Sequence, residues 1–148
     1  MFRGSSFHTI DPKGRIIIPT RFRDVIKASG IDSIMITRMD RCLFAYTHDQ
    51  WGKLEQKILD LHEKSESMRR FQRTFIGGAH DCKCDAQGRV LIPPFLKQYS
   101  KLEKEIVLVG VTARFEIWSR ENWDRENELM EKDMRDDQVR REIAQLGI

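Results

Sequence analysis

The sequence predicts an α+β protein with a β-rich, barrel-like core, built from two tandem repeats related by pseudo-twofold symmetry and flanked by longer helices. Two observations predict this fold. Residues 10–19 recur at 84–93 with Asp, Gly, Arg, Ile and Pro in place, and residues 34–51 recur at 106–123 with matching aliphatic and aromatic positions. The chain has 148 residues, the size of one domain. Each half is too small to close a core alone, so we expect repeats 1–74 and 75–148 to fold as one unit.

Each repeat begins with a predicted β-hairpin and a short helix. In the first repeat, strands at 7–10 and 15–18 flank a tight turn in which Gly14 supplies a permissive backbone. Pro19 favours a helix start because its fixed φ suits the first helical position, and Gly30 ends that helix. The second repeat has the same pattern, with Gly88 at the turn.

Two further strands and a longer helix complete each repeat. In the first repeat, β-rich segments at 34–37 and 43–47 flank the polar turn 38–41. One long amphipathic helix is predicted from about Asp49, and a second runs nearly to the C-terminus. The apolar spacing of the first uses Trp51, Leu54, Ile58, Leu61, Ser65 and Met68; that of the second uses Trp123, Met130, Met134 and Ile143. Trp51, Trp123, Met130 and Met134 are interpreted as packing or subunit-interface residues.

Composition excludes several classes of protein. Hydrophobic residues make up 40% and charged residues 33% of the chain, which excludes a disordered or collagen-like chain. The longest apolar runs, at 16–18 and 106–111, fall far short of the roughly 18 residues of a membrane span. No apolar segment follows Met1, so we expect no signal peptide and a cytoplasmic, nucleoid-associated protein.

The charge is unevenly spread along the chain. Residues 1–118 carry 20 Lys and Arg against 14 Asp and Glu, a net +6, whereas residues 119–148 carry 6 against 9, a net −3. A basic body with an acidic helical tail is a modest indication of an anionic partner. Arg69, Arg70 and Arg73 are interpreted as cations that favour the C-terminal end of a helix.

The three cysteines predict neither a disulfide framework nor a metal centre. Their odd number in an unsecreted chain argues against disulfides. Cys82 and Cys84 form a Cys-x-Cys beside His80, but no second ligand pair exists. A strand beside a turn is the preferred interpretation, with a metal site as the alternative.

The repeated feature that indicates function is Asp-x-x-x-Arg, at Asp11–Arg15 and Asp85–Arg89. An aspartate that opens a turn accepts backbone N–H groups, and it also fixes the arginine. A guanidinium held on a hairpin suits bidentate recognition of phosphate or guanine. The alternative is a salt bridge that only stabilises the turn, but a twofold display of arginines matches the periodic grooves of a duplex.

The order strand, Asp-x-x-Gly-Arg, aliphatic strand, Pro and short helix resembles the AbrB/SpoVT swapped-hairpin family of bacterial DNA-binding proteins. The resemblance covers essentially the whole chain, and it includes the segments at 1–4, 75–79, 91–94 and 115–118. It implies two fused swapped-hairpin repeats and a transcriptional regulator of a cell-division and cell-wall gene cluster. That regulator binds short direct repeats of double-stranded DNA in its own promoter, and it assembles into a ring-like homo-oligomer.

The resemblance also implies which residues contact DNA. The family's contacts lie in the Asp-x-x-x-Arg segments and carry over to Asp11, Lys13, Arg15, Asp85 and Arg89. Arg3 and Lys83 are added as candidate basic contacts. Because Gln87 replaces Lys13 in the second turn, we expect the first repeat to dominate DNA affinity.

The sequence also bears on two other function classes. An enzyme is disfavoured, since no glycine-rich phosphate loop, HExxH or GxSxG motif occurs and the four histidines lack metal-ligand spacing. We therefore expect no catalytic residue, metal, cofactor, small-molecule substrate or membrane partner. The remaining alternative is an antitoxin-like or scaffold protein that acts mainly through protein partners of its acidic helix.

Overall fold

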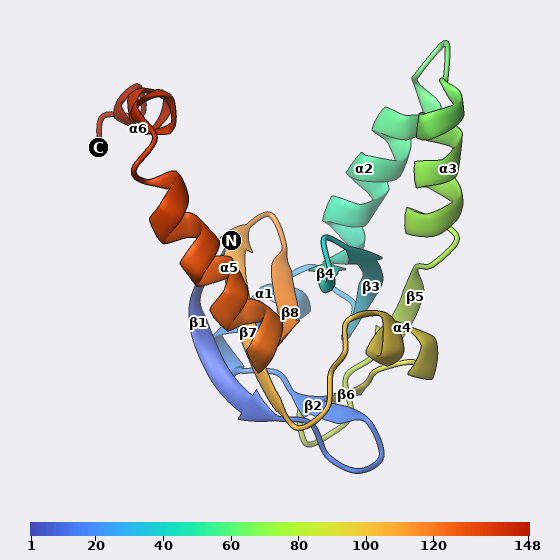
Figure 1. The fold of residues 1–148 in the computed structure, drawn as a ribbon. Helices are drawn as coiled ribbons and strands as arrows, with labels where there is room; N and C mark the ends of the chain where they lie inside the picture. The colour runs from blue at the N-terminus through green and yellow to red at the C-terminus, as the bar shows by residue number, and fades with distance from the viewer.

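The computed structural model describes residues 1–148, with eight strands and six helices. The strands are β1 Phe2–Thr9, β2 Arg15–Ile17, β3 Ser33–Met39, β4 Cys42–Tyr46, β5 His80–Lys83, β6 Arg89–Leu91, β7 Glu105–Thr112 and β8 Phe115–Ser119. The helices are α1 Thr20–Ala28, α2 His48–Leu59, α3 Glu66–Phe75, α4 Pro94–Tyr99, α5 Arg120–Asp133 and α6 Asp137–Ala144. Figure 1 shows the strands gathered in the centre, with two helical projections leaving on opposite sides. No helix has the length and apolar character needed to cross a membrane.

Strands of both repeats form one antiparallel sheet, in which a central β-hairpin from each repeat lies beside the other and each edge strand pairs with the hairpin of the other repeat. Its order is β1-β7-β8-β4-β3-β5, and a separate two-stranded ribbon pairs β2 with β6. Exchanging β1 with β5, β3 with β7 and β4 with β8 gives the same order read from the opposite edge of the sheet. This is the pseudo-twofold symmetry that the repeats predict. Each edge strand pairs with a strand of the other repeat, β1 with β7 and β5 with β3. Each repeat therefore supplies a strand that completes the sheet of the other.

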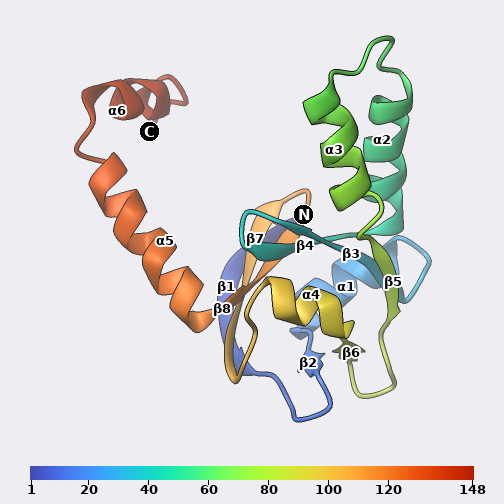
Figure 2. The ribbon, with the colours of Figure 1, turned by 45° about the vertical axis from the view of Figure 1, so that its right-hand side comes forward.

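The sheet buries apolar side chains on both faces. Strand β4 shows this directly, because Leu43 and Ala45 belong to one hydrophobic cluster whereas Cys42, Phe44 and Tyr46 belong to the other. The larger cluster lies between the sheet and a layer made of α1, α4 and the β2–β6 ribbon. The smaller cluster lies under the α2–α3 hairpin and the start of α5. Burial on two faces anchors the ribbon at one end of the molecule and the helical projections at the other (Figure 2).

Three aromatic rings fix the centre of the larger cluster. Phe2, Phe22 and Phe115 lie with ring centroids 5.0–5.3 Å apart, and none is more than 2% exposed. Aromatic groups at this separation add about 0.5–1.5 kcal/mol per pair beyond their buried area. The rings come from β1, α1 and β8, so this contact joins the N-terminal strand to the second repeat.

The α+β class and the tandem repeat are confirmed, but the core is not closed into a barrel. Strands β1 and β5 are the two edges of the sheet and do not pair with each other. Closure would need the neighbouring strands β2 and β6 to join those edges. Each of these strands is only three residues long and pairs with the other, and a single bridge between Cys84 and Val90 is the only pairing of the ribbon with the end of an edge strand. The inner face of the sheet is covered by packing rather than by further strand pairing.

The two long helices predicted from apolar spacing are both interrupted. Ser65, predicted to lie inside the first helix, is the N-cap of α3 and accepts a hydrogen bond from the Met68 N–H at 3.1 Å. Asp136 caps α6 in the same way, accepting from the Gln138 N–H at 2.8 Å. Short polar side chains compete with the helical backbone for N–H groups, so they start new helices where the apolar period alone predicts continuation.

Strand β1 is longer than the predicted strand at 7–10. All eight residues from Phe2 to Thr9 pair with β7. The partner strand approaches closely because Gly110 has no side chain, and a Cβ at that position would collide with the Arg3 backbone. The partner lies about a hundred residues away in the chain, so local alternation in the sequence did not reveal this pairing.

Candidate nucleic-acid interface

The first Asp-x-x-x-Arg segment forms a tight turn between β1 and β2. The Asp11 Oδ1 atom accepts the backbone N–H groups of Lys13 and Arg15, both at 2.9 Å. The Asp11 carbonyl oxygen accepts the Gly14 N–H at 2.9 Å, and Gly14 has a φ of 86°, in the left-handed region that glycine tolerates. The carboxylate therefore fixes the backbone of the turn.

The same carboxylate also fixes the arginine side chain. Arg15 Nε donates to Asp11 Oδ2 at 2.6 Å. The Nη1 and Nη2 atoms of Arg15 make no hydrogen bond within the protein, so the end of the guanidinium is free. Both side chains are 30% exposed, so the pair lies at the surface without being fully solvated.

The second segment repeats this geometry. Asp85 Oδ1 accepts the N–H groups of Gln87 at 2.9 Å and Arg89 at 2.8 Å, and Arg89 Nε donates to Asp85 Oδ2 at 2.8 Å. Gly88 has a φ of 77°. Both repeats therefore hold one guanidinium by its Nε and leave its outer nitrogens available.

These hydrogen bonds lower the pKa of both aspartates. For Asp11 the largest cause is the Arg15 backbone N–H, followed by the Arg15 guanidinium and the Lys13 N–H. For Asp85 the causes are the Arg89 backbone N–H, the Arg89 guanidinium and then the Gln87 N–H. Both groups remain carboxylates at neutral pH, which keeps each arginine paired and oriented.

The β2–β6 ribbon brings the two turns together from opposite ends of the sequence. The register pairs Arg15 with Leu91 and Ile17 with Arg89. The backbone also crosses between the turns, since Ile18 N–H donates to the Gly88 carbonyl and Ile92 N–H donates to the Gly14 carbonyl, each at 2.9 Å. The two arginines occupy a diagonal across this ribbon, where α-carbons lie about 7–8 Å apart.

The outward face of the ribbon combines two arginines with two aliphatic side chains. Ile16 and Val90 point inward and are fully buried, so the alternation of a strand places their neighbours outward. Ile17 is 53% exposed and Leu91 is 57% exposed. The sequence alone did not identify Ile17 and Leu91 as surface residues. The matching aliphatic segments of the two repeats contained the signal: in a three-residue strand whose middle side chain points to the core, the two flanking side chains point outward.

The structure places the other predicted contacts differently. Lys13 is exposed at the tip of the first turn, and Lys83 is exposed at the end of β5, directly before the second turn. Arg3 lies near the opposite end of β1, about 26 Å of extended strand from Asp11. The ribbon thus gathers six of the seven candidate residues and excludes Arg3, whose carbonyl oxygen accepts from Arg21 at 3.5 Å.

The layer around the ribbon is the basic part of the molecule. Residues 9–27 and 83–104, which form the turns, the ribbon, α1 and α4, carry 10 Lys and Arg against 4 Asp and Glu. Their net charge is +6, whereas the remainder of the chain has a net charge of −3. A polyanion is therefore attracted to the end of the molecule that displays the paired arginines.

The geometry elsewhere offers little for catalysis or metal binding. No group of three or more His, Cys, Asp and Glu side chains is placed to hold a metal ion. Burial raises the pKa of Cys82 to about 12 and that of Cys84 to about 11, so both remain protonated thiols. His48 lies beside Ser33 and Asp81, at 2.9 and 3.0 Å, but both contacts use Nε2 and do not form a relay across the ring.

Comparison with known proteins places the whole chain in one group. A family described as "MraZ protein, putative antitoxin-like" matches residues 1–74 and again residues 75–143. A protein from Desulforapulum autotrophicum is 60% identical over 148 residues and covers 100% of both chains. Another from Desulfosudis oleivorans is 52% identical over the same length, and one from Moorella thermoacetica is 46% identical over 120 residues, 81% of this chain and 82% of that protein. Each of the three is named "Transcriptional regulator MraZ".

Proposed function

This chain belongs to the MraZ family, and we propose that it is a sequence-specific DNA-binding transcriptional regulator that acts without catalysis. One observation carries the proposal: two carboxylate-anchored arginines lie on the outward face of a protruding two-stranded ribbon. The names of its relatives agree with this function. So does the net charge of +6 around the ribbon.

The ribbon fits the major groove of B-form DNA. That groove is about 12 Å wide and admits a two-stranded β-ribbon. Arg15 and Arg89 each present a free pair of Nη atoms, which suits bidentate contact with O6 and N7 of guanine. Because each Nε is already held, little side-chain entropy is lost when the contact forms.

The remaining ribbon residues divide between base and backbone contacts. Ile17 and Leu91 are apolar and exposed between the arginines, a position that suits the methyl group of thymine. Lys13 and Lys83 are flexible point charges at the edges of the ribbon, and they suit phosphate oxygens. Asp11 and Asp85 were expected among the DNA contacts; because their oxygens already accept from the turn and the arginine, we assign them the role of positioning the arginines.

We further propose that the protein regulates its own promoter, at the front of a cell-division and cell-wall gene cluster, by binding short direct repeats. A homo-oligomer in a ring would present one ribbon per subunit along one rim. Subunits related by rotation in a ring face the same way, and direct repeats in DNA also face the same way. Association with the nucleoid follows from DNA binding.

The test is equilibrium binding to labelled duplexes, at about 0.05 and 0.2 M salt, a range over which phosphate contacts strongly affect affinity. One duplex carries the sequence directly upstream of the protein's own gene, and the other is a shuffled sequence. Wild type is compared with the double variant Arg15→Ala/Arg89→Ala. Each lost bidentate contact should weaken binding roughly 5- to 150-fold, so the variant should lose its preference for the promoter.

The matched control is Arg125→Ala, since Arg125 is an exposed arginine on α5 that pairs only with Glu121 and Asn122. It should bind the promoter as wild type does. If the double variant prefers the promoter as strongly as wild type, the ribbon is not the DNA-binding surface. A wild type without any preference between the duplexes would favour a role through protein partners instead.

A further inference from the structure

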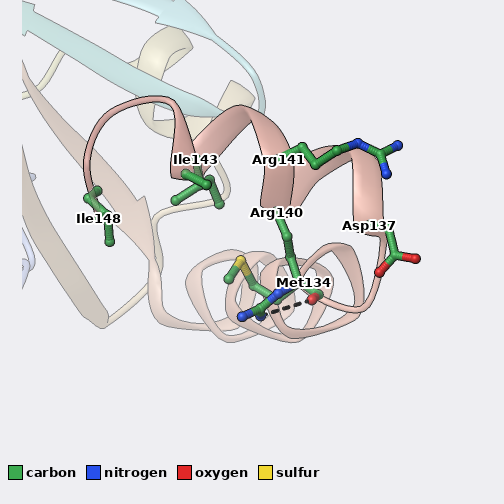
Figure 3. Close-up of a pocket in the computed structure, with 7 residues that line it drawn as sticks. Met134, Asp137, Arg140, Arg141, Ile143 and Ile148 are labelled. Atoms are coloured by element: carbon green, nitrogen blue, oxygen red, sulfur yellow. Dashed lines mark hydrogen bonds between the residues drawn. The ribbon is translucent and has the colours of Figure 1, made fainter.

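The hollow at the bend between α5 and α6 does not bring polar groups together. It has a volume of about 570 Å³ and is lined in part by Met134, Ile143 and Ile148 (Figure 3). Arg140 donates to the Met134 carbonyl oxygen at 3.4 Å, and the Arg141 guanidinium points away from Ile143. Ligand sites combine an apolar lining with a few convergent polar groups. The feature without an assigned role lies elsewhere, beside the ribbon.

A third arginine lies against the second turn of the ribbon. Arg23 belongs to α1 of the first repeat, and its guanidinium packs on Gly88 in the turn of the second repeat. A Cβ on Gly88 would lie 2.6 Å from Nη1, 2.8 Å from Cζ and 2.9 Å from Nε of Arg23. These distances are shorter than any real contact, so the guanidinium occupies the space that a side chain would need. Glycine at position 88 therefore permits a close contact between the two repeats.

Packing alone holds this arginine in place. The Nε atom of Arg23 is buried and has no hydrogen-bond partner. No carboxylate forms an ion pair with its guanidinium, whereas Arg15 and Arg89 are each paired with an aspartate. A buried donor without a partner costs free energy, and such a group in a folded protein needs a physical explanation. The contact with the turn is the one interaction that offers that explanation.

The first turn has no equivalent support. The residue that corresponds to Arg23 in the second repeat is Lys97 on α4, 74 positions further along the chain. A Cβ at Gly14 would meet the Ile92 carbonyl oxygen at 3.6 Å and Leu91 Cδ1 at 3.8 Å, and Lys97 is not among its nearest neighbours. The two turns therefore share their internal hydrogen bonds but differ in what packs against them.

The contact at Gly88 bears directly on the arginine that follows it. The Gly88 N–H donates to the Asp85 carbonyl oxygen at 3.0 Å, and the Gly88 carbonyl accepts from Ile18 at 2.9 Å. The Asp85 carboxylate in turn holds the Arg89 Nε at 2.8 Å. Because the Arg23 guanidinium blocks movement of Gly88 toward α1, it also limits movement of the carboxylate and the guanidinium on the same turn.

We propose that Arg23 is a positioning residue, which holds the second turn so that Arg89 meets DNA in a fixed place. This inference rests on the proposed DNA-binding function and deepens it, since the effect of Arg23 on affinity passes through Arg89. A turn that is ordered before binding loses less entropy when the ribbon enters the groove. The second turn, which has Gln87 where the first has Lys13, thus gains affinity without a further phosphate contact.

A double-mutant cycle on the full-length protein tests the proposal, with the promoter duplex as the probe. Arg23→Ala alone should weaken binding about three- to tenfold, the size of a coupling between neighbouring residues. In an Arg89→Ala background the same change should have almost no effect, because the side chain that Arg23 positions is gone. In an Arg15→Ala background it should keep its full effect. The slope of log affinity against log salt should stay at the wild-type value, because no phosphate contact is lost.

Amide hydrogen exchange provides a second measurement that needs no DNA. In the free protein, Arg23→Ala should accelerate exchange at the Gly88 and Arg89 amides and leave the Gly14 and Arg15 amides unchanged. This comparison uses the first turn as an internal reference, because both turns have the same pattern of backbone hydrogen bonds. Unchanged exchange at Gly88 would overturn the proposal whatever the protein binds.

Arg21→Ala is the matched control, since Arg21 lies on the same helix but its guanidinium faces Gly4 and the Arg3 carbonyl oxygen near the start of β1. It should bind the promoter as wild type does. The proposal is overturned if Arg23→Ala weakens binding equally in both backgrounds, or if it lowers the salt slope by about 0.9, which would indicate a direct phosphate contact. A wild type without preference for the promoter would instead refute the proposed function.

Discussion

The two Asp-x-x-x-Arg turns have the same internal geometry but different surroundings. In each turn the aspartate holds two backbone N–H groups and one guanidinium, with Nε–Oδ2 distances of 2.6 and 2.8 Å. The first turn carries Lys13 at its tip, where the second carries Gln87. A Cβ at Gly14 would lie in ordinary van der Waals contact with Ile92 and Leu91, whereas a Cβ at Gly88 would collide with the guanidinium of Arg23, which packs against that turn. Duplication has therefore retained the anchored arginine, while the charge beside it has diverged.

Separating the repeats should have the largest effect on the molecule. Chains 1–74 and 75–148, expressed singly, should form no folded monomer, because β1 loses β7 and β4 loses β8. Circular dichroism and sedimentation would measure this. Co-expression of the two halves should restore a folded pair, since the missing strand partners are then present. A folded 1–74 monomer would show that the repeats are independent domains.

Replacing the anchoring carboxylate should have the next largest effect. Asp11→Asn places an amide N–H₂ or a single oxygen where Oδ2 now accepts the Arg15 Nε–H, so the guanidinium loses its fixed position. Promoter affinity should fall about tenfold, because the charge-assisted hydrogen bond that orients the guanidinium is lost. If the aspartate acted only through its charge, its removal near phosphates would strengthen binding, so the sign of the change decides between the two roles.

Asp85→Asn is the matched variant for the second turn, and the similar geometry predicts a similar loss of promoter affinity.

The lowered pKa of both aspartates makes the stability of the fold depend on pH. Their contribution to stability is present above the ordinary aspartate pKa of about 3.9 and is lost as pH falls through the lower folded-state values. Asp11→Asn should therefore reduce the acid sensitivity of thermal unfolding below about pH 4. An unchanged acid limb would contradict the anchoring role.

Truncating the exposed aliphatic side chains Ile17 and Leu91 should have a smaller effect on DNA affinity, seen with the promoter duplex and not with shuffled DNA. Ile17→Ala and Leu91→Ala remove surface that the free protein already exposes, so the unfolding temperature should change little. Binding to the promoter should weaken about three- to tenfold, for a lost apolar contact of roughly 1 kcal/mol. Affinity for shuffled DNA should remain unchanged. An equal loss of affinity for both duplexes would show that Ile17 and Leu91 contribute to binding independently of the base sequence.

The sequence predicted the turns well because their chemistry is local. Asp, Gly and Arg act within five residues, and repetition of the pattern revealed its importance. The ribbon could not be predicted from the same residues, because Ile18 and Ile92 donate to carbonyl groups in the opposite turn, at least 70 residues away in the chain. The broken helices have a third cause: apolar spacing continues from Ile58 through Met68, but Ser65 captures a backbone N–H and starts a new helix.

The smallest expected effect concerns the one difference between the turns that bears on DNA. Lys13→Gln should remove a phosphate contact and lower the slope of log affinity against log salt by about 0.9. At 0.15 M salt this corresponds to about a fivefold loss. Gln87→Lys should give the opposite change, because the second turn presents the same backbone to solvent. The exchange variant that carries both substitutions should recover the wild-type slope.

That exchange tests whether the first turn dominates by position or only by charge. Recovery of the wild-type slope and affinity would show that the two turns are equivalent once their charge is equal, as their matching hydrogen bonds suggest. If the salt slope recovers while promoter affinity stays low, the lysine forms a phosphate contact in either turn, but the contact in the second turn contributes less to affinity. The second turn would then be restricted by its neighbours, foremost the Arg23 guanidinium against Gly88, which has no counterpart at Gly14.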